Sequence, residues 1–367
     1  MLKVAQIWGR VQGKLFGRLE QCLDTKLSPK QQRLVAILEI IRIEEHVPSG
    51  FAQRMGRPRR DRRALARAFV VKAFYNLPQT NLLIEMLRAD ATLLAICGWR
   101  DLSELPEAST FSRAFEEFAT SKLCDRVHVA LVKEHVSEHL VGHISRDATA
   151  IEAREKPVKK APKPVKPKRR PGRPKKGEVV AKSPEPPKRL PRQLEQDPLQ
   201  ALAELPTACD VGAKRNSKGH TTFWIGYKMH LDVSDAGLPI TAVTTSASLH
   251  DSQVAIPMEK LTAQRVTSLY TLMDSAYDAK LIEQCCQSHG HVPIIDRQRR
   301  SGDKPSWDPA TARRYGERTV VERVNSRLKD HFGGRHLRVR GHTKAHSHLM
   351  FGLVVLFADQ LLQLVTY

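Results

Sequence analysis

A segment near the middle of the chain, from Lys156 to Arg192, has a composition that cannot form a hydrophobic core. It contains fifteen Lys and Arg, ten Pro and two Glu, with few apolar side chains. Such a segment cannot bury enough apolar surface to offset the entropy lost on folding, and its prolines keep the backbone extended. We therefore predict a disordered basic linker or insertion over residues 156–207, which divides the foldable chain into two parts.

The positive charge of this linker belongs to an excess that extends over the whole chain. The 367 residues include 60 Lys and Arg against 39 Asp and Glu, a formal net charge of +21 at pH 7. This balance indicates a polyanionic partner, with nucleic acid the first candidate and an anionic membrane surface the second. The length allows two or three domains with hydrophobic cores.

Within the linker, the sequence RRPGRPKK (Arg169 to Lys176) resembles the AT-hook, a short motif that lies in the DNA minor groove. Arg side chains meet an enhanced negative potential in the narrow minor groove of A·T-rich DNA. The resemblance implies that Arg170, Arg173 and Lys175 contact such DNA. A basic linker also produces this match by chance, and the alternative is non-specific attraction to phosphates.

The first 140 residues have the patterns of several short helices. Ser28-Pro29, Asp61 and Thr80 are start signals, each followed by apolar residues at helical spacing. Short helices with basic residues near their starts fit a DNA-binding helix-turn-helix, and a plain helical bundle fits the same pattern. We predict an all-α N-terminal DNA-binding domain over residues 1–140.

The segments 141–155 and 208–367 instead combine strand and helix periodicities. In chain order they predict a strand at 143–151, a hairpin at 222–247, a helix ending at 261, a strand at 268–274, a helix at 278–289, a strand at 291–295 and helices at 315–329 and 343–364. This order predicts an α/β fold with a central mixed sheet and flanking helices. The linker separates the first strand from the rest.

The predicted helix at 315–329, with the sequence YGERTVVERVNSRLK, has two distinct faces. Its apolar face consists of Val321, Val324 and Leu328. Its polar face consists of Tyr315, Arg318, Glu322 and Lys329. One interpretation is a solvated face with ordinary ion pairs between successive turns. The other is a binding face on which a carboxylate lies among cations.

Three carboxylates favour the second interpretation. Asp147 lies within the first strand, Asp274 ends a buried strand and Glu322 projects from the helix, with 127 and 48 residues between them. Side chains on strands and on an adjoining helix can converge above a sheet. Three carboxylates repel one another unless cations lie between them, and Mg²⁺ or Mn²⁺ prefers such oxygen ligands. Two ions roughly 3.5–4 Å apart would support phosphodiester chemistry, and we expect two per site.

The spacing of the polar face resembles a known signature. Y-x2-R-x3-E-x6-K is typical of the YREK group of insertion-sequence DDE transposases, and the helix at 315–329 meets it without a gap. RDATAIEARE resembles the first-Asp strand of this family, GYKMHL its second strand and LMDSAYDA its second-Asp motif. The resemblance covers about 142–154 and 208–367, and the helical N-terminus more loosely.

The resemblance implies an RNase H-like catalytic core. Its catalytic metal ligands would be Asp147, Asp274 and Glu322. Its contacts to DNA phosphates near the scissile bond would be Tyr315, Arg318 and Lys329.

Two features depart from the family pattern. The second position after the second Asp is often Gly in the family, and here it is Ala276. Better-studied YREK members also carry a large β-rich insertion before the Glu helix, for which the 48-residue interval here leaves no room. The extra segment instead lies between the first and second strands. This leaves open whether strand processing passes through a DNA hairpin, which that insertion helps to support.

The resemblance implies a DNA transposase that binds the ends of an insertion sequence and catalyses metal-dependent cleavage and strand transfer. A catalytically inactive or domesticated DNA-binding protein and a structure-specific nuclease are the alternatives. We expect double-stranded DNA as partner, a homodimer in the active complex, no membrane contact and a cytoplasmic, nucleoid-associated location. The six cysteines lack metal-finger spacing and are interpreted as reduced thiols. The most apolar segment, 349–358, is too short to cross a bilayer.

Several other polar residues are assigned other roles. His342, His346 and His348 have no carboxylate or Cys close in sequence, which favours phosphate contact or surface placement over metal binding. Asp210 is interpreted as a supporting or loop residue, and Asp251 as a helix N-cap. No Gly-rich phosphate loop followed by Lys-Ser or Lys-Thr occurs, so ATP-driven activity is not expected.

Overall fold

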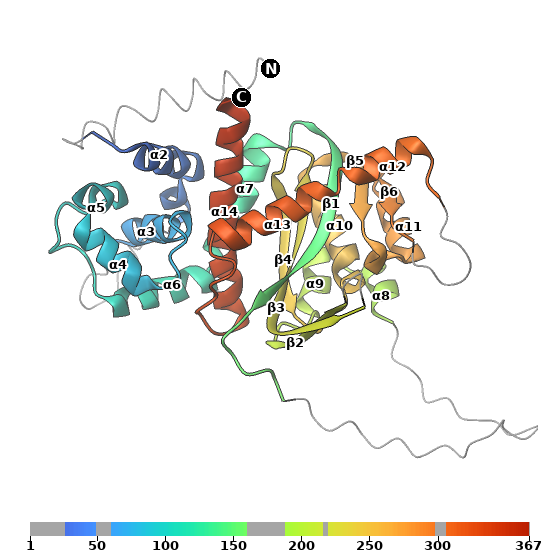
Figure 1. Ribbon diagram of the computed structural model, residues 1–367, viewed down its shortest axis with the longest axis horizontal. Helices are drawn as coiled ribbons and strands as arrows, with labels where there is room; N and C mark the ends of the chain where they lie inside the picture. Colours follow the sequence, from blue (N-terminus) through green and yellow to red (C-terminus); the bar gives the residue numbers. More distant parts are fainter. Residues whose placement is uncertain (1–25, 49–59, 160–187, 216–218, 298–305, 367) are drawn as a thin grey trace, which may run out of the picture.

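A computed structural model describes residues 26–48, 60–159, 188–215, 219–297 and 306–366. A group of helices lies on one side and a mixed sheet with its own helices on the other, and α14 (His342–Thr366) runs between them (Figure 1). The mixed α/β architecture predicted from the sequence is confirmed.

The helical side begins where the sequence carries capping residues. It consists of α2 (Pro29–Ile41), η2 (Ile43–His46), α3 (Arg62–Phe74), α4 (Thr80–Ala89), α5 (Ala91–Cys97), α6 (Ala108–Thr120) and α7 (Leu123–His135). Ser28 and Gln31 form a capping box at the start of α2, and the Asp61 side chain accepts a hydrogen bond from the Arg63 N–H at the start of α3. The predicted helix starts are therefore confirmed.

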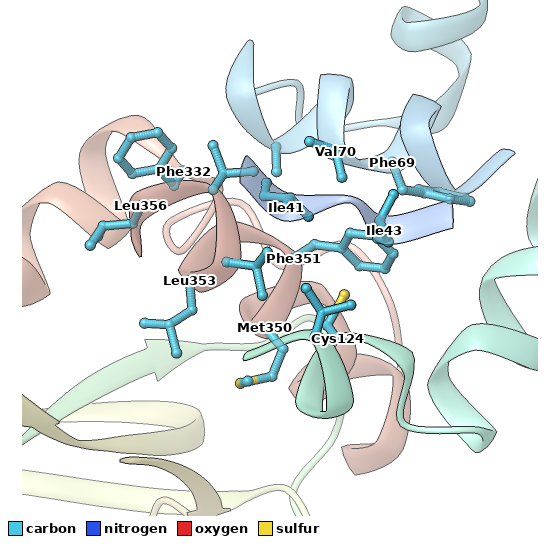
Figure 2. Packing of buried hydrophobic residues seen from close by; sticks show 14 of the residues in the cluster. Ile41, Ile43, Phe69, Val70, Cys124, Phe332, Met350, Phe351, Leu353 and Leu356 are labelled. Atoms are coloured by element: carbon cyan, nitrogen blue, oxygen red, sulfur yellow. The ribbon is translucent and has the colours of Figure 1, made fainter. Parts of the chain in front are cut away.

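The C-terminal helix α14 forms the centre of this helical side. It packs against α2, α3, α6 and α7, and on its other flank against α13 (Thr319–His331) and β4 (Pro239–Ser246). Figure 2 shows Phe351 of α14 next to Phe69 of the helical side, with ring centroids 5.6 Å apart, and Met350 and Leu353 of the same helix belong to the same hydrophobic cluster. One hydrophobic core therefore runs across the predicted domain boundary at residue 140.

The apolar stretch of α14 is longer than the segment 349–358 that the sequence predicted to be too short to cross a bilayer. The helix is long and apolar enough to cross a membrane, but 72% of its most apolar window is buried within the protein. Asp359 extends this buried stretch, because its carboxylate is paired with Arg33 at 2.6 Å and with Arg327 at 2.8 Å. The apolar side chains of α14 therefore serve as core contacts between the two sides.

The sheet has six strands in two pairing senses. Its members are β1 (Leu140–Glu152), β2 (Asp210–Arg215), β3 (Thr221–Ser234), β4, β5 (Thr267–Met273) and β6 (Val292–Ile295). The path runs β2-β3-β1-β5-β6, and β4 pairs with the edge of β3 that β2 also uses. β1, β5 and β6 are parallel, whereas β1–β3, β2–β3 and β3–β4 are antiparallel.

Helices cover the sheet on both faces. In Figure 1, α13 crosses in front of the sheet, and α10 (Ser252–Arg265) and α11 (Lys280–Ser288) lie behind it. The short helices η3 (Ser275–Tyr277) and α12 (Pro309–Gly316) follow β5 and precede α13, respectively. Because β1 is central, its side chains are buried on both faces, and consecutive residues face different helices.

The linker prediction was wrong at its C-terminal end. Residues 189–203 form two helices, α8 (Arg189–Glu195) and α9 (Pro198–Ala203), which pack on α10 and, for α8, also on α11. Leu190 and Leu194 contact the core there. Lys260 Nζ donates to the carbonyls of Gln193 and Leu194 at 3.0 and 2.8 Å, which satisfies groups at the end of α8. The Pro-rich composition of this segment gave no clear helical pattern, so the two short helices were not predicted.

Candidate active site

Asp147 lies in the middle of β1, on the face of the sheet that α13 covers. Its Oδ2 accepts a hydrogen bond from Asn325 Nδ2 of α13 at 3.1 Å, and its Oδ1 lies 3.7 Å from Arg318 Nη1. Burial raises the pKa of Asp147 to about 6. Arg318 opposes this shift, and the negative charge of Asp274 adds to it.

Asp274 directly follows β5, and the parallel pairing of β1 with β5 brings it beside Asp147. Arg146 and Met273 are partners in this register, and each carboxylate is the next residue of its chain segment. Asp274 Oδ1 accepts a hydrogen bond from the Ala276 N–H at 2.9 Å, at the turn that begins η3. Burial raises the pKa of Asp274, and that N–H lowers it. A bound cation would stabilise two such neighbouring carboxylates.

Glu322 lies in the first turn of α13, and 55% of its side chain is exposed. Its Oε1 accepts a hydrogen bond from Arg318 Nη2 at 2.6 Å, and Arg318 Nη1 faces Asp147. The guanidinium therefore lies between two of the three predicted carboxylates. Within the described residues, no group of three or more His, Cys, Asp or Glu side chains is arranged to hold a metal ion. The three predicted ligands thus lie near one region of the sheet without converging on one point.

The predicted continuous helix over 315–329 was wrong, because the chain breaks between α12 and α13. The Glu317 and Arg318 N–H groups bond back to Arg314 and Tyr315 carbonyls, at 3.1 and 3.0 Å, in a tightened last turn after which α13 begins. Gly316 favours a break there, because glycine stabilises a helix poorly.

Tyr315 nevertheless stays beside the site. Its ring packs on Trp307 with centroids 4.3 Å apart, and the Arg318 guanidinium lies 5.9 Å from its centroid. Burial raises the pKa of Tyr315 to about 12, so the phenol stays protonated and can donate a hydrogen bond. The helix break therefore changes how Tyr315 is held without removing it from Arg318.

Lys329 is half-buried on α13, and its charge interacts with the site. Burial lowers its pKa, Arg335 and Lys214 lower it further, and Asp147 opposes them. Lys214 belongs to β2 and also lowers the pKa values of Asp147 and Asp274. Two lysines and Arg318 thus bring positive charge to a pair of buried carboxylates.

Comparison with known families decides what kind of protein has this arrangement. Residues 143–358 match the family model described as Transposase DDE domain, which is more than half of the chain and includes all three carboxylates. The chain belongs to the DDE transposase family. Residues 21–117 also match a Transposase domain model (DUF772). No curated protein and no solved structure matches the chain.

Sequence analysis of this DDE transposase missed two polar residues beside the carboxylates. Lys214 was missed because β2 was not predicted as a strand. The strand β2 is ordered by its pairing with β3, which the local sequence does not reveal. Asn325 was overlooked, although it lies three residues after Glu322 and therefore on a neighbouring position of the same helix face. It is 6% exposed, and its Oδ1 has no hydrogen-bond partner.

A second polar group of this transposase, the Arg146 cluster, lies on the opposite face of β1. It comprises Arg146, Asp232, Glu259, Thr262 and His291. Arg146 Nε and Nη2 each donate to Asp232 at 2.7 Å, and Nη2 also donates to Glu259 at 2.8 Å. His291 Nδ1 lies 2.6 Å from Glu259 Oε1. All these side chains are buried, and the cluster joins β1, β3, α10 and the start of β6.

The three histidines near the start of α14 are partly buried and held by contacts to other elements, so they do not stand free on the surface, and the predicted phosphate contact stays a prediction. His346 contacts Asp125 at 2.8 Å and Thr244 Oγ1 at 2.9 Å, which supplies the carboxylate that the sequence did not reveal. His342 contacts the Thr244 carbonyl at 2.8 Å, and His348 the Gly333 carbonyl at 3.0 Å.

The remaining predicted residues fall in three places. Asp210 is the buried first residue of β2, which replaces the predicted loop position. Asp251 occupies the N-cap position of α10, but its carboxylate pairs with Lys228 at 2.8 Å and does not cap the helix. The AT-hook-like residues Arg170, Arg173 and Lys175 lie outside the described residues.

Proposed function

We propose that this protein is a transposase that binds the ends of an insertion sequence and catalyses metal-dependent DNA cleavage and strand transfer. The observation that carries the proposal is the neighbouring placement of Asp147 and Asp274 on parallel strands, with the pKa of each raised by burial. Buried groups with displaced pKa values beside specific charges are typical of active sites. The family match supplies the reaction class.

The residues present fit a divalent cation. Asp147 and Asp274 supply neighbouring anionic oxygens, and the Asn325 Oδ1 beside them has no partner. Glu322 would join them once its carboxylate leaves Arg318, since it is exposed and free to turn. We propose these three carboxylates as ligands of two Mg²⁺ or Mn²⁺ ions, which activate an attacking oxygen and stabilise the leaving oxygen when bound.

The chain's own cations would position the DNA. Arg318 would exchange Glu322 for a phosphate oxygen, because a guanidinium binds phosphate in the same forked geometry as a carboxylate. Lys329 would hold a neighbouring phosphate, and the protonated Tyr315 would donate a hydrogen bond to a third oxygen. Asn325 would keep Asp147 turned toward α13 through its Nδ2 donor. We accordingly propose that the protein belongs to the YREK group and has an RNase H-like core.

The wider assignments follow from the same proposal. The helical N-terminal residues would bind element ends, and Arg170, Arg173 and Lys175 would add minor-groove or phosphate contacts. A homodimer would pair two ends in the active complex. A cytoplasmic, nucleoid-associated location fits a chain with a net charge of +21.

The test uses Asp147→Asn with Asp101→Asn as control, because Asp101 is an exposed acid on the helical side. We expect Asp147→Asn to abolish Mg²⁺-dependent cleavage of a supercoiled plasmid that carries the element, while DNA affinity stays within about twofold of wild type. Mn²⁺ should raise the melting temperature of wild type and of the control but not of Asp147→Asn, since only a bound ion stabilises the fold. A variant that cuts normally would refute the assignment.

A further inference from the structure

A hollow of about 460 Å³ opens where the helical side meets the loop between α13 and α14. This volume lies within the range of roughly 300–1,000 Å³ that is usual for ligand pockets. Its apolar lining consists of Ala73, Leu77, Val339 and four phenylalanines, Phe69, Phe115, Phe332 and Phe351. Figure 2 shows three of them, Phe69, Phe332 and Phe351. The lining comes from both matched transposase regions, so neither region forms the hollow alone.

Positive charge surrounds this apolar lining. Lys72, Arg338, Arg340 and Lys344 all line the hollow. The Lys72 side chain is largely buried, with the residue 8% exposed, and its ammonium has no hydrogen-bond or ion-pair partner among the described residues, whereas its carbonyl accepts a hydrogen bond from the Leu77 N–H at 2.9 Å. The single carboxylate paired with these cations belongs, within the described chain, to Glu116, which lies 3.0 Å from Lys344. A buried ammonium without a partner is costly, and an anionic ligand would offset that cost.

We propose that the hollow binds one nucleotide of a DNA strand, with its base against the phenylalanines and its phosphate at Lys72. Aromatic side chains that stack on bases, beside cations that track the backbone, are the usual means of binding an unpaired strand. Each stacked base contributes appreciably and without sequence preference, because every base has a π-face. The inference deepens the proposed function and rests on it for the source of the strand.

The position of the hollow relative to the carboxylates supports a DNA occupant. Asn76 fastens the end of α13 beside it: Asn76 Nδ2 donates to the Asp330 carbonyl at 2.8 Å, and Asn76 Oδ1 accepts from the Gly333 N–H at 2.9 Å. The distance along α13 from Glu322 to Phe332 is about 15 Å. Such a distance corresponds to about four nucleotide steps at 3.4 Å each. A strand that crosses Lys329 would therefore reach the hollow within a few nucleotides of the site.

The experiment measures binding of fluorescein-labelled oligothymidylate and of dTMP to the full chain. Lys72→Met removes the buried charge, and Lys133→Met removes the same charge from an exposed position on α7. We expect Lys72→Met to bind the oligonucleotide about tenfold more weakly, with the slope of log affinity against log salt reduced by about 0.7. Lys133→Met should bind as wild type does. Melting temperatures confirm folding, and Lys72→Met should melt no lower than wild type.

Two further measurements keep the result specific. Ser112→Trp places a bulky side chain at the exposed edge of the hollow and should weaken binding without altering the core. An oligonucleotide with 5-iodouracil should photocrosslink to the hollow's phenylalanines in wild type and not in Ser112→Trp.

The outcomes separate this inference from the proposed function. If Lys72→Met and Ser112→Trp bind and crosslink as wild type does while wild type cleaves DNA, the hollow is not a nucleotide site and the transposase assignment stands. If dTMP binds with the same dependence on Lys72 and the oligonucleotide does not, the occupant is a free nucleotide and the DNA source is refuted. If neither probe binds wild type, the inference fails whatever the cleavage result.

Discussion

Arg146 and Asp147 are consecutive residues of β1, yet their charges have opposite surroundings. Arg146 is fully buried among Asp232 and Glu259, with every charge paired at 2.7–2.8 Å. Although burial alone would raise the pKa of Glu259, Arg146 and His291 lower it to about 2. Asp147 lies beside Arg318 at 3.7 Å, and its pKa is raised to about 6. On one face of β1, direct ion pairs lower the pKa of a buried carboxylate, and on the other face burial raises the pKa of Asp147 despite a nearby guanidinium.

The difference separates a structural ion cluster from the proposed binding site. A charge network whose partners are complete has no capacity left for a ligand, and it holds β1, β3 and α10 in one arrangement. Asp147 and Asp274 have pKa values that stay raised by burial although Arg318 and Lys214 lie nearby, and a bound cation would stabilise their ionised forms further. The largest expected effects on stability therefore belong to the Arg146 side of β1, and the largest effects on catalysis to the Asp147 side.

The strongest test of the comparison is Arg146→Met. The substitution leaves two buried carboxylates without their guanidinium, and we expect the free energy of unfolding to fall by about 3–5 kcal/mol. Urea denaturation measures it, with Arg323→Met as control because Arg323 is an exposed cation on α13. The control should stay within about 0.5 kcal/mol of wild type. A loss below about 1 kcal/mol for Arg146→Met would mean that the cluster is not structural.

The acid stability of the protein tests the same cluster. The folded pKa of Glu259 is about 2 against 4.5 for the free side chain, so its ionisation stabilises the fold above about pH 4.5. This contribution, roughly 3 kcal/mol, is lost as the pH falls toward 2. The loss of stability between pH 5 and pH 3 should be smaller in Glu259→Gln than in wild type, as measured by urea denaturation at both pH values. Equal losses would contradict the assignment.

On the other face, Arg318→Ala and Lys329→Ala should fold normally and lose activity. If they position phosphates, misplacement by about 1 Å lowers the rate roughly a hundredfold. The assay measures strand transfer of a pre-cut element end, with melting temperature recorded alongside. Arg323→Ala is the matched control; Arg327→Ala is unsuitable, because Arg327 pairs with the buried Asp359 at 2.8 Å. Equal activity in Arg318→Ala, Lys329→Ala and Arg323→Ala would show that Arg318 and Lys329 do not position DNA.

The smallest expected effect belongs to Asn325→Ala. Loss of one hydrogen bond to a carboxylate costs about 1.5–3 kcal/mol where the geometry depends on it, and Asp147 keeps Arg318 nearby. We expect cleavage about tenfold slower, with DNA affinity unchanged. At low Mg²⁺ concentration, cleavage by Asn325→Asp should be slower than cleavage by Asn325→Ala. The added aspartate places a third buried negative charge beside Asp147. Wild-type cleavage rates in both variants would show that Asn325 has no role in positioning Asp147.

Local signals predicted much of the fold. The caps at Ser28 and Asp61, the hairpin of β3 and β4 and the buried strand β5 all depend on neighbouring residues, and each was confirmed. The elements that were not predicted depend on contacts with residues far away in the sequence. β2 is ordered by its pairing with β3, and α8 by Lys260 and the α10 surface, so their short and polar sequences carried little signal.

The sequence by itself indicated a mixed α/β core and a helical N-terminus, because helix and strand periodicities are properties of neighbouring residues. The choice of Asp147, Asp274 and Glu322 as candidate ligands followed from the resemblance of their surrounding motifs to DDE transposases. Only the tertiary structure decided which charges are compensated: Arg146 meets its partners 86 and 113 residues away, while Arg318 reaches Asp147 across 171 residues. Those distances in sequence are closed by the sheet register and by the packing of α13 and α10, which no local pattern encodes.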